Sequence, residues 1–254
     1  MPLDVSLRPI ALAYTLAMVG ILAFLWYKGR ISRTLAAAVL VVSAIFGFLF
    51  ASVAPYQFQL ALLELAGGPG GTLVFAVIGL GLFVVLTLIF GRIFCASLCP
   101  LGAIQELAYL APVSKVKPRV KLWLSALRLV IFAGIIIAAL LFSVGVLAFL
   151  GVMDFFLLSF TAGFLVMLTL LVVSLFFYRP FCRIICPFGA VLSLAGMGSL
   201  FKLRRNPSCI ECGKCEFACP ADEAKREDLK GECYLCGRCT EVCPVKGAIT
   251  YRRG

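Results

Sequence analysis

Residues 209–220 read CIECGKCEFACP, and residues 233–244 read CYLCGRCTEVCP. Each run has the spacing C-x2-C-x2-C-x3-C-P, which wraps a cubane iron–sulfur cluster in thiolates. A tight loop brings three closely spaced cysteines to three corners of one cube, and the fourth cysteine of each run crosses to the other cluster. The two runs are therefore predicted to form a single unit that holds two [4Fe-4S] clusters.

The crossing of the fourth cysteine divides the eight predicted ligands into two sets. The cluster-1 cysteines are Cys209, Cys212, Cys215 and Cys243, and the cluster-2 cysteines are Cys233, Cys236, Cys239 and Cys219. Zinc sites and a disulfide framework are the alternatives. Zinc ribbons use C-x2-C pairs without the third cysteine and the following proline. Disulfides need an oxidising compartment.

The rest of the chain is too apolar for a soluble domain. Of its 254 residues, 63% are hydrophobic, and the mean hydropathy is +1.09. This density indicates a polytopic membrane protein. Five apolar runs predict transmembrane helices at about residues 10–27, 35–54, 73–90, 122–142 and 160–178. The predicted fold class is an all-α polytopic membrane protein with a C-terminal ferredoxin-like α+β domain of about 50 residues, whose clusters take the place of a large core.

A sequence repeat with a period of 87 residues runs through the apolar part. Residues 92–103 read RIFCASLCPLGA and residues 179–190 read RPFCRIICPFGA, with seven of twelve positions identical. Each copy consists of a helix, a connection, a second helix and Cys-x3-Cys-Pro. The chain is thus predicted to contain an N-terminal helix with its basic loop (1–34), two helical-hairpin repeats (35–111 and 112–200) and the ferredoxin domain (201–254).

Both repeats end in Cys-x3-Cys-Pro, which supplies four further cysteines. These CxxxC cysteines are Cys95, Cys99, Cys182 and Cys186. On a helical turn this spacing places both sulfurs of a pair on one face, and the following proline suits the first turn of the next helix. If the repeats pack about a pseudo-twofold axis, the four thiolates converge on a third metal site. A third iron–sulfur cluster is the favoured occupant. Copper or zinc, redox-active thiols and simple buried cysteines are the alternatives.

The distribution of charge predicts how the chain sits in the membrane. Lysine and arginine outnumber aspartate and glutamate by 23 to 12, yet the connections 55–72 and 143–159 contain no basic residue. This asymmetry indicates a multi-pass protein of the cell inner (cytoplasmic) membrane, with the ferredoxin domain in the cytoplasm. The basic residues are expected to face the lipid bilayer and its anionic headgroups rather than nucleic acid.

The absence of histidine excludes several redox centres. With no histidine in the chain, a His-ligated haem and a Rieske centre are excluded. Protons would have to move through carboxylates, tyrosines or water. Glu64 and Asp154 lie in the two connections that lack basic residues. Each is either a solvated loop carboxylate or a proton acceptor beside a quinol site.

Four arginines lie near the CxxxC cysteines or within an apolar run. Arg92, Arg179 and Arg183 flank the cysteines. They are expected to contact lipid headgroups, with charge compensation of an anionic cluster as the alternative. Arg128 lies six residues into its apolar run and is expected to extend to the membrane interface.

The chain resembles the NapH/MauN-type ferredoxin-like membrane proteins, which are related to the C-terminal half of NosR. The resemblance rests on the Cys-x3-Cys-Pro segments at 95–100 and 182–187 and on the runs at 209–220 and 233–244, and it covers roughly residues 35–250. It implies membrane electron transfer linked to the quinone pool, usually in the service of a respiratory or periplasmic reductase. The chain departs from the family in its five predicted helices, where four are usual, and in having no NosR-like flavin domain.

Together these features predict a one-electron relay between a cytoplasmic-side donor or partner subunit and quinone or another membrane redox subunit. The chemistry would be supplied by the clusters, and the protein would act as the electron-transfer component of an oxidoreductase. Two other hypotheses stay open. The chain could be a wire inside a larger respiratory complex without its own quinone site, or a redox maturation or regulatory factor.

Overall fold

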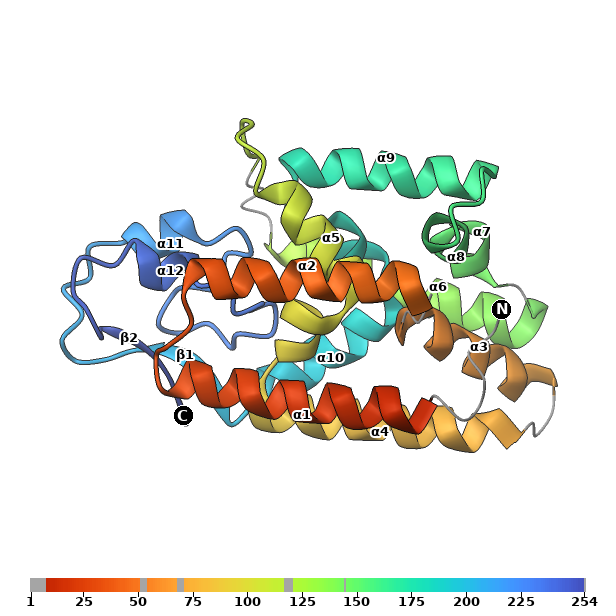
Figure 1. The fold of residues 1–254 in the computed structure, drawn as a ribbon, viewed down its shortest axis with the longest axis horizontal. Coiled ribbons are helices and arrows are strands. Elements are labelled where there is room, and N and C mark those ends of the chain that lie inside the picture. Colours follow the sequence, from red (N-terminus) through yellow and green to blue (C-terminus); the bar gives the residue numbers. More distant parts are fainter. Residues whose placement is uncertain (1–7, 51–53, 68–70, 117–120, 144, 254) are drawn as a thin grey trace.

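The computed structural model describes residues 8–50, 54–67, 71–116, 121–143 and 145–253, and it is mostly helical (Figure 1). The longer helices are α1 (Arg8–Tyr27), α2 (Arg33–Phe50), α3 (Ala54–Gly67), α4 (Gly71–Phe90), α5 (Pro100–Tyr109), α6 (Lys121–Phe142), α9 (Ala162–Phe176) and α10 (Pro187–Met197). The shorter elements are the π-helical turns η2 (Phe94–Leu98) and η3 (Phe181–Ile185), the helices α7 (Val146–Phe149), α8 (Val152–Phe156), α11 (Lys214–Ala218) and α12 (Arg238–Glu241), and the strands β1 (Phe201–Arg205) and β2 (Ile249–Arg253).

Each of the five apolar runs forms a helix. Helices α1, α2, α4 and α6 contain 20, 18, 20 and 22 residues. Helix α9 has 15 residues and is shorter than its run, because Phe177 adopts extended backbone and forms a parallel bridge with Val116. The connections that lack basic residues are also largely helical, since they contain α3, α7 and α8.

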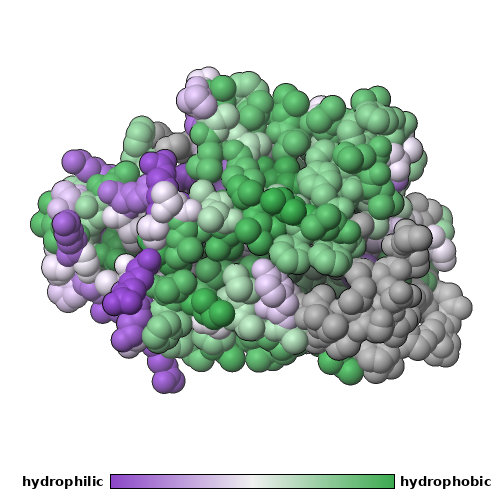
Figure 2. Space-filling view, viewed as in Figure 1, coloured by the Kyte–Doolittle hydropathy of each residue, from purple (hydrophilic) through white to green (hydrophobic). Residues whose placement is uncertain are grey.

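The surface of the helical part is strongly apolar. Among the residues whose side chains the structure describes, α2 is the one helix whose length and composition suffice to cross a membrane, and the described side chains of α1, α4, α6 and α9 cover shorter apolar stretches. Val130, Leu141 and Phe142 of α6 are 70%, 75% and 71% exposed. Figure 2 shows hydrophobic residues over most of the visible helical part and hydrophilic residues gathered at the end that holds the C-terminal domain. So wide an apolar surface indicates contact with an apolar medium or a partner.

The two copies of the repeat are interleaved. Elements α2, α4, η2 and α5 of the first copy correspond to α6, α9, η3 and α10 of the second, and η2 begins at Phe94 where η3 begins at Phe181, the offset of the sequence repeat. Helix α5 packs against α9 of the second copy, and α10 packs against α4 of the first. Each copy thus places the helix that follows its cysteines against the other copy, which brings the two cysteine segments together.

The C-terminal domain is closed by an antiparallel strand pair. Phe201 of β1 pairs with Arg253 of β2, and Arg205 pairs with Ile249. The domain is thus a small two-stranded sheet with the two short helices α11 and α12. Figure 1 shows it, in blue, at one end of the molecule, away from α3, α7 and α8.

Helix α1, which lies outside the repeat, packs against this domain. Its Val19 and Leu22 share an apolar core with Leu203 of β1 and Tyr251 of β2. The Tyr251 hydroxyl donates to the carbonyl oxygen of Phe90 at the end of α4, at 2.7 Å. The C-terminal domain is therefore fixed to the helical part by apolar packing and by buried polar contacts.

Candidate metal centres

Two cavities in the C-terminal domain are each bordered by four cysteines. One cavity is lined by the four cluster-1 cysteines. The other is lined by the four cluster-2 cysteines together with Tyr178 and Tyr234. The structure thus brings the fourth cysteine of each run to the first three cysteines of the other run. Four sulfurs around one cavity form the donor set that a [4Fe-4S] cluster takes.

Each cysteine run turns sharply between its second and third cysteine. Gly213 and Gly237 occupy these turns with φ of +71° and +80°, and each immediately precedes a short helix, α11 or α12, which carries the third cysteine. Glycine adopts positive φ without the steric penalty that a Cβ brings. The turn directs all three closely spaced sulfurs of a run toward one cavity.

The Cys-x3-Cys segments form π-helical turns, and not the ordinary helical turns predicted from their spacing. The N–H of Cys99 donates to the carbonyl of Phe94 at 2.9 Å, and that of Cys186 donates to Phe181 at 2.9 Å. Such bonds between residues five apart define a π-turn. A residue before proline favours extended backbone, and Cys99 and Cys186 have ψ of 118° and 113°. Both prolines occupy the first helical position, as predicted.

All four CxxxC cysteines are buried within one apolar core. Cys99 and Cys186 are the N-cap residues of α5 and α10, so two helix N-termini are directed at this group of sulfurs. The Sγ of Cys186 accepts a hydrogen bond from the Gly189 N–H at 3.2 Å, and the Sγ of Cys182 accepts one from Gln105 Nε2 at 3.3 Å. Helix N-termini and N–H donors favour thiolate over thiol.

Burial has the opposite effect on these thiols. It raises the pKa of Cys182 to about 11 and that of Cys99 and Cys186 well above the usual range, and neighbouring thiols of the set add to the shift. Because a metal ligand must be a thiolate, a bound cation is needed to offset the clustered negative charge. The site therefore fits a cationic metal centre with four sulfur ligands.

The distances among the cysteine sulfurs bear on whether a site suits a single metal ion or a cluster. Among the residues that the structure describes, no three His, Cys, Asp or Glu side chains are grouped closely enough to hold a single metal ion. A single zinc ion binds its thiolates at about 2.3 Å and so draws them together. A cubane binds each thiolate on a different iron and accepts a wider set.

Arg92 and Arg179 lie inside the protein and do not reach lipid headgroups, contrary to the sequence-based expectation. They are 2% and 1% exposed. Arg179 donates to the carbonyl oxygens of Cys95 and Ala96 at 2.6 and 2.7 Å. Arg92 donates to the carbonyl oxygen of Gly189 at 3.2 Å. Each repeat arginine thus binds backbone in or beside the cysteine segment of the other copy, which explains its burial.

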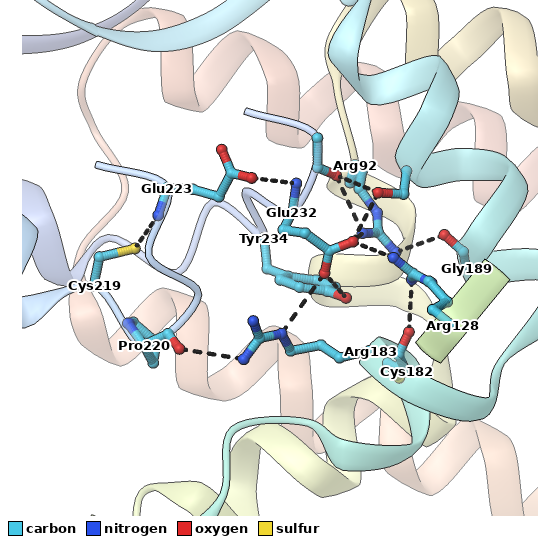
Figure 3. Close-up of polar contacts among 12 residues, drawn as sticks. Arg92, Arg128, Cys182, Arg183, Gly189, Cys219, Pro220, Glu223, Glu232 and Tyr234 are labelled. Atoms are coloured by element: carbon cyan, nitrogen blue, oxygen red, sulfur yellow. Dashed lines mark hydrogen bonds and ion pairs between the residues drawn. The ribbon is translucent and has the colours of Figure 1, made fainter. Parts of the chain in front are cut away.

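The buried Glu232 joins the C-terminal domain to both repeats (Figure 3). Its carboxylate forms ion pairs with Arg92 at 3.4 Å, with Arg128, and with Arg183 at 3.7 Å, and it accepts a hydrogen bond from Ser193 at 2.7 Å. Arg183 and Arg128 are 3% and 5% exposed, so neither extends to an interface as expected. Burial alone would raise the pKa of Glu232, but Arg92 and Arg128 hold that pKa below its usual value.

A second buried carboxylate, Glu106 of α5 in the first repeat, also forms ion pairs that join the C-terminal domain to the helical part. It pairs with Arg179 at 2.9 Å and with Arg238 of the cluster-2 run at 2.6 Å. Burial would raise the pKa of Glu106, but Arg179 and Arg238 lower it. Glu106 therefore carries a negative charge that fastens the cluster-2 run to the helical part.

Sequence reasoning missed both of these carboxylates. Glu106 is one of only four acidic residues before residue 206, and its rarity among many arginines was a usable signal for a buried ion pair. Glu232 is one of eight acidic residues in the last 49 and carries no such signal. Its role depends on how the domain docks, which local sequence does not specify.

The sequence leaves open whether Glu64 and Asp154 are solvated loop carboxylates or proton acceptors beside a quinol site. The side chain of Glu64 lies outside the described residues. Asp154 lies in α8 and accepts a hydrogen bond from the hydroxyl of Thr161, the N-cap residue of α9. The structure therefore shows Asp154 at a helix boundary.

Comparison with family models matches the two repeats that carry the CxxxC cysteines. A family model described as a 4Fe-4S binding domain matches twice, at residues 72–120 and 159–207. The second match starts 87 residues after the first, at 159 against 72, and each match contains one pair of CxxxC cysteines. No solved structure matches the chain.

Three relatives illustrate the range of similar proteins. MJ0750 of Methanocaldococcus jannaschii is 35% identical over 59% of this chain and 68% of its own length. YccM of Escherichia coli K12, named as an electron transport protein, is 32% identical over 55% of this chain and 44% of its own. The methylamine utilization ferredoxin-type protein MauN of Paracoccus denitrificans is 30% identical over 60% and 56%. The matches span 68%, 44% and 56% of the lengths of these three relatives. The chain belongs to the NapH/MauN-type family of ferredoxin-type iron–sulfur electron transport proteins.

Proposed function

We propose that this chain is a multi-pass membrane protein that relays single electrons through three iron–sulfur clusters. The relay runs between a cytoplasmic-side donor or partner subunit and the quinone pool or another membrane redox subunit. The observation that carries the proposal is the grouping of all twelve cysteines into three sets of four, two around cavities and one at paired helix N-termini. The clusters supply the one-electron chemistry when bound.

Several features support a position in the membrane. Helices α1, α4 and α6 contain 20, 20 and 22 residues, and about 20 residues span the hydrocarbon layer. Leu49 of α2 and Ile78 of α4 are 71% and 61% exposed, as is expected of side chains that contact lipid. Nearly all the basic residues lie on one side of the predicted spans, and by the positive-inside rule this asymmetry supports a cytoplasmic C-terminal domain.

The residues of the chain would hold and tune the clusters. The N–H of Glu223 donates to the Sγ of Cys219 at 3.3 Å, as Gly189 and Gln105 do to CxxxC sulfurs. Such donors and the buried arginines lower the cost of negative charge on a cluster and raise its reduction potential. The apolar core around the CxxxC cysteines excludes water from the third site.

The metal content of the purified protein tests the proposal. Anaerobic purification in mild detergent is expected to give about twelve iron atoms per chain, because each of three cubanes holds four. The double variant Cys95→Ala/Cys182→Ala is expected to keep about eight. Iron and acid-labile sulfide are measured chemically, with EPR after dithionite reduction. Eight iron atoms in the unaltered chain would exclude a third cubane, and a colourless, EPR-silent protein would refute the whole proposal.

The crossing of the fourth cysteines makes a separate prediction. Cys243→Ala is expected to abolish the signal of the cluster held by Cys209, Cys212 and Cys215, although Cys243 lies in the other run. Cys219→Ala is expected to abolish the signal of the other cluster. EPR after stepwise reduction distinguishes the two signals, and loss of the cluster nearest in sequence to the altered cysteine would contradict the assignment.

The quinone link is tested with the unaltered protein. A menaquinol or ubiquinol analogue is expected to exchange electrons with the clusters of the purified chain, which is followed by their visible absorbance. If no quinol analogue exchanged electrons with the clusters and a redox subunit co-purified, the result would instead support an electron-transfer subunit of a larger complex without its own quinone site.

A further inference from the structure

A layer of two tyrosines and two arginines lies between the cluster-2 cavity and the CxxxC cysteines. We call Tyr178, Tyr234, Arg92 and Arg179 the tyrosine–arginine layer. Both tyrosines line the cluster-2 cavity, and both belong to the apolar core that contains the CxxxC cysteines. Their ring centroids lie 5.8 Å apart with an interplanar angle of 77°. The layer therefore borders both cysteine sets.

Tyr234 contacts both of the arginines that the repeat relates to each other. The Cζ atoms of Arg92 and Arg179 lie 4.4 and 4.8 Å from the centroid of its ring, within the range of cation–π contacts. The guanidinium of Arg179 also binds the carbonyl of Cys95, and that of Arg92 binds the carbonyl of Gly189. Each arginine thus contacts Tyr234 and backbone in or beside a cysteine segment, so it connects the surroundings of the two sites.

Among the described residues, none that lines the cluster-1 cavity belongs to the helical part. Every residue that lines it lies between Arg205 and Ile249, within the C-terminal domain. Cys212 of this set is exposed, and the neighbouring Ile210 is 64% exposed. This cavity therefore faces the outside of the molecule.

We infer an order in which electrons pass through the three cysteine sets. The cluster-2 cysteines form the inner relay site, and the cluster-1 cysteines form the outer port. The tyrosine–arginine layer is the contact through which electrons pass between the inner site and the CxxxC cysteines. The inference rests on the proposed function. The transfer moves one electron, so one site is oxidised and the other reduced by one electron, with no bond formed or broken.

The two arginines are positioning residues: both contact Tyr234, which lines the inner site, and both bind backbone in or beside the CxxxC segments. A reduced cluster carries one more negative charge than the oxidised one, so two buried guanidinium groups beside it stabilise the reduced form. Buried charges act strongly at short range and weakly at a distance. The effect should therefore reach the inner site and the CxxxC site and leave the outer port unchanged.

A cluster-resolved redox titration of the full-length protein, followed by EPR, tests the inference. Arg179→Gln and Arg92→Gln are each expected to make reduction of the inner cluster about tenfold less favourable, a shift of about 59 mV for one electron. Arg179→Lys and Arg92→Lys keep the charge and are expected to restore the potential. Arg226→Gln, in an ion pair whose two side chains are 56% and 68% exposed, is the control and is expected to shift neither potential. The signal of the outer cluster is identified by Cys212→Ser, which alters one exposed ligand.

A second measurement tests the adjacency without altering the layer. In the reduced protein, the spin relaxation of the inner cluster is expected to slow in the Cys95→Ala/Cys182→Ala variant, because its paramagnetic neighbour is lost, while that of the outer cluster stays the same. Equal shifts of both potentials in the glutamine variants, or a relaxation change at the outer cluster, would overturn the inference and leave the proposed relay intact. Iron-free protein would instead refute the relay itself.

Discussion

Glu232→Gln is expected to destabilise the folded protein by about 3–5 kcal/mol, because it leaves buried guanidinium groups without their counter-charge. The carboxylate faces Arg92, Arg128 and Arg183 in a site that excludes water. Glutamine has nearly the same shape but no charge. The expected result is a lower midpoint of thermal unfolding in detergent and faster proteolysis between the helical part and the C-terminal domain.

The matched control for this variant is Glu211→Gln. Glu211 directly precedes the cluster-1 residue Cys212, as Glu232 directly precedes the cluster-2 residue Cys233. It pairs with Arg226 at 3.3 Å, but the two side chains are 68% and 56% exposed. Exposed ion pairs contribute about 0–1 kcal/mol. If both variants unfolded at the same temperature, the buried network would not be what fastens the domain.

The paired variants Gly102→Ala and Gly189→Ala are expected to disrupt the site of the CxxxC cysteines. A Cβ at Gly102 would lie 2.7 Å from the carbonyl oxygen of Cys95, and one at Gly189 would lie 2.9 Å from that of Cys182. These neighbours are backbone atoms of the π-turns, so the turns themselves must shift. Such overpacking costs about 1–3 kcal/mol at each position.

The measurement is iron content together with thermal unfolding. We expect the Gly102→Ala/Gly189→Ala protein to lose about four iron atoms, the content of one cubane, while the C-terminal clusters stay bound. Gly134→Ala is the control, because a Cβ at this position in α6 would meet nothing within 4 Å. It should stabilise the helix by about 0.5–1 kcal/mol. Full iron in the double variant would show that the close approach of α5 and α10 to the π-turns is not needed for the site.

The sequence was informative wherever a local rule applies. The C-x2-C-x2-C-x3-C spacing predicts two sets of cluster ligands, because ligand geometry constrains neighbouring residues. Hydrophobic runs predicted the five long helices, and the prolines after Cys99 and Cys186 marked helix starts. These features depend on residues a few positions apart.

Features that depend on distant partners were not predictable in the same way. The arginines beside the cysteines were expected at the lipid surface, since single charges near apolar runs usually lie there. Their burial follows from partners far away in the chain: Arg179 binds Glu106, 73 positions earlier, and Arg128 binds Glu232, 104 positions later. The π-turns were also missed, because the four-residue spacing fits an α-helical turn equally well.

The hydrogen bonds of Arg92 to residues far away in the sequence have a consequence for biogenesis. Its hydrogen-bond partners Gly189, Gly231 and Glu232 follow it by 97, 139 and 140 positions. Of these partners Glu232 is the one that carries a negative charge, so the charge of Arg92 is paired only after residue 232 has been synthesised and the C-terminal domain has docked. Docking of the C-terminal domain is thus expected to complete the folding of the first repeat, and a chain truncated before Glu232 is expected to be degraded.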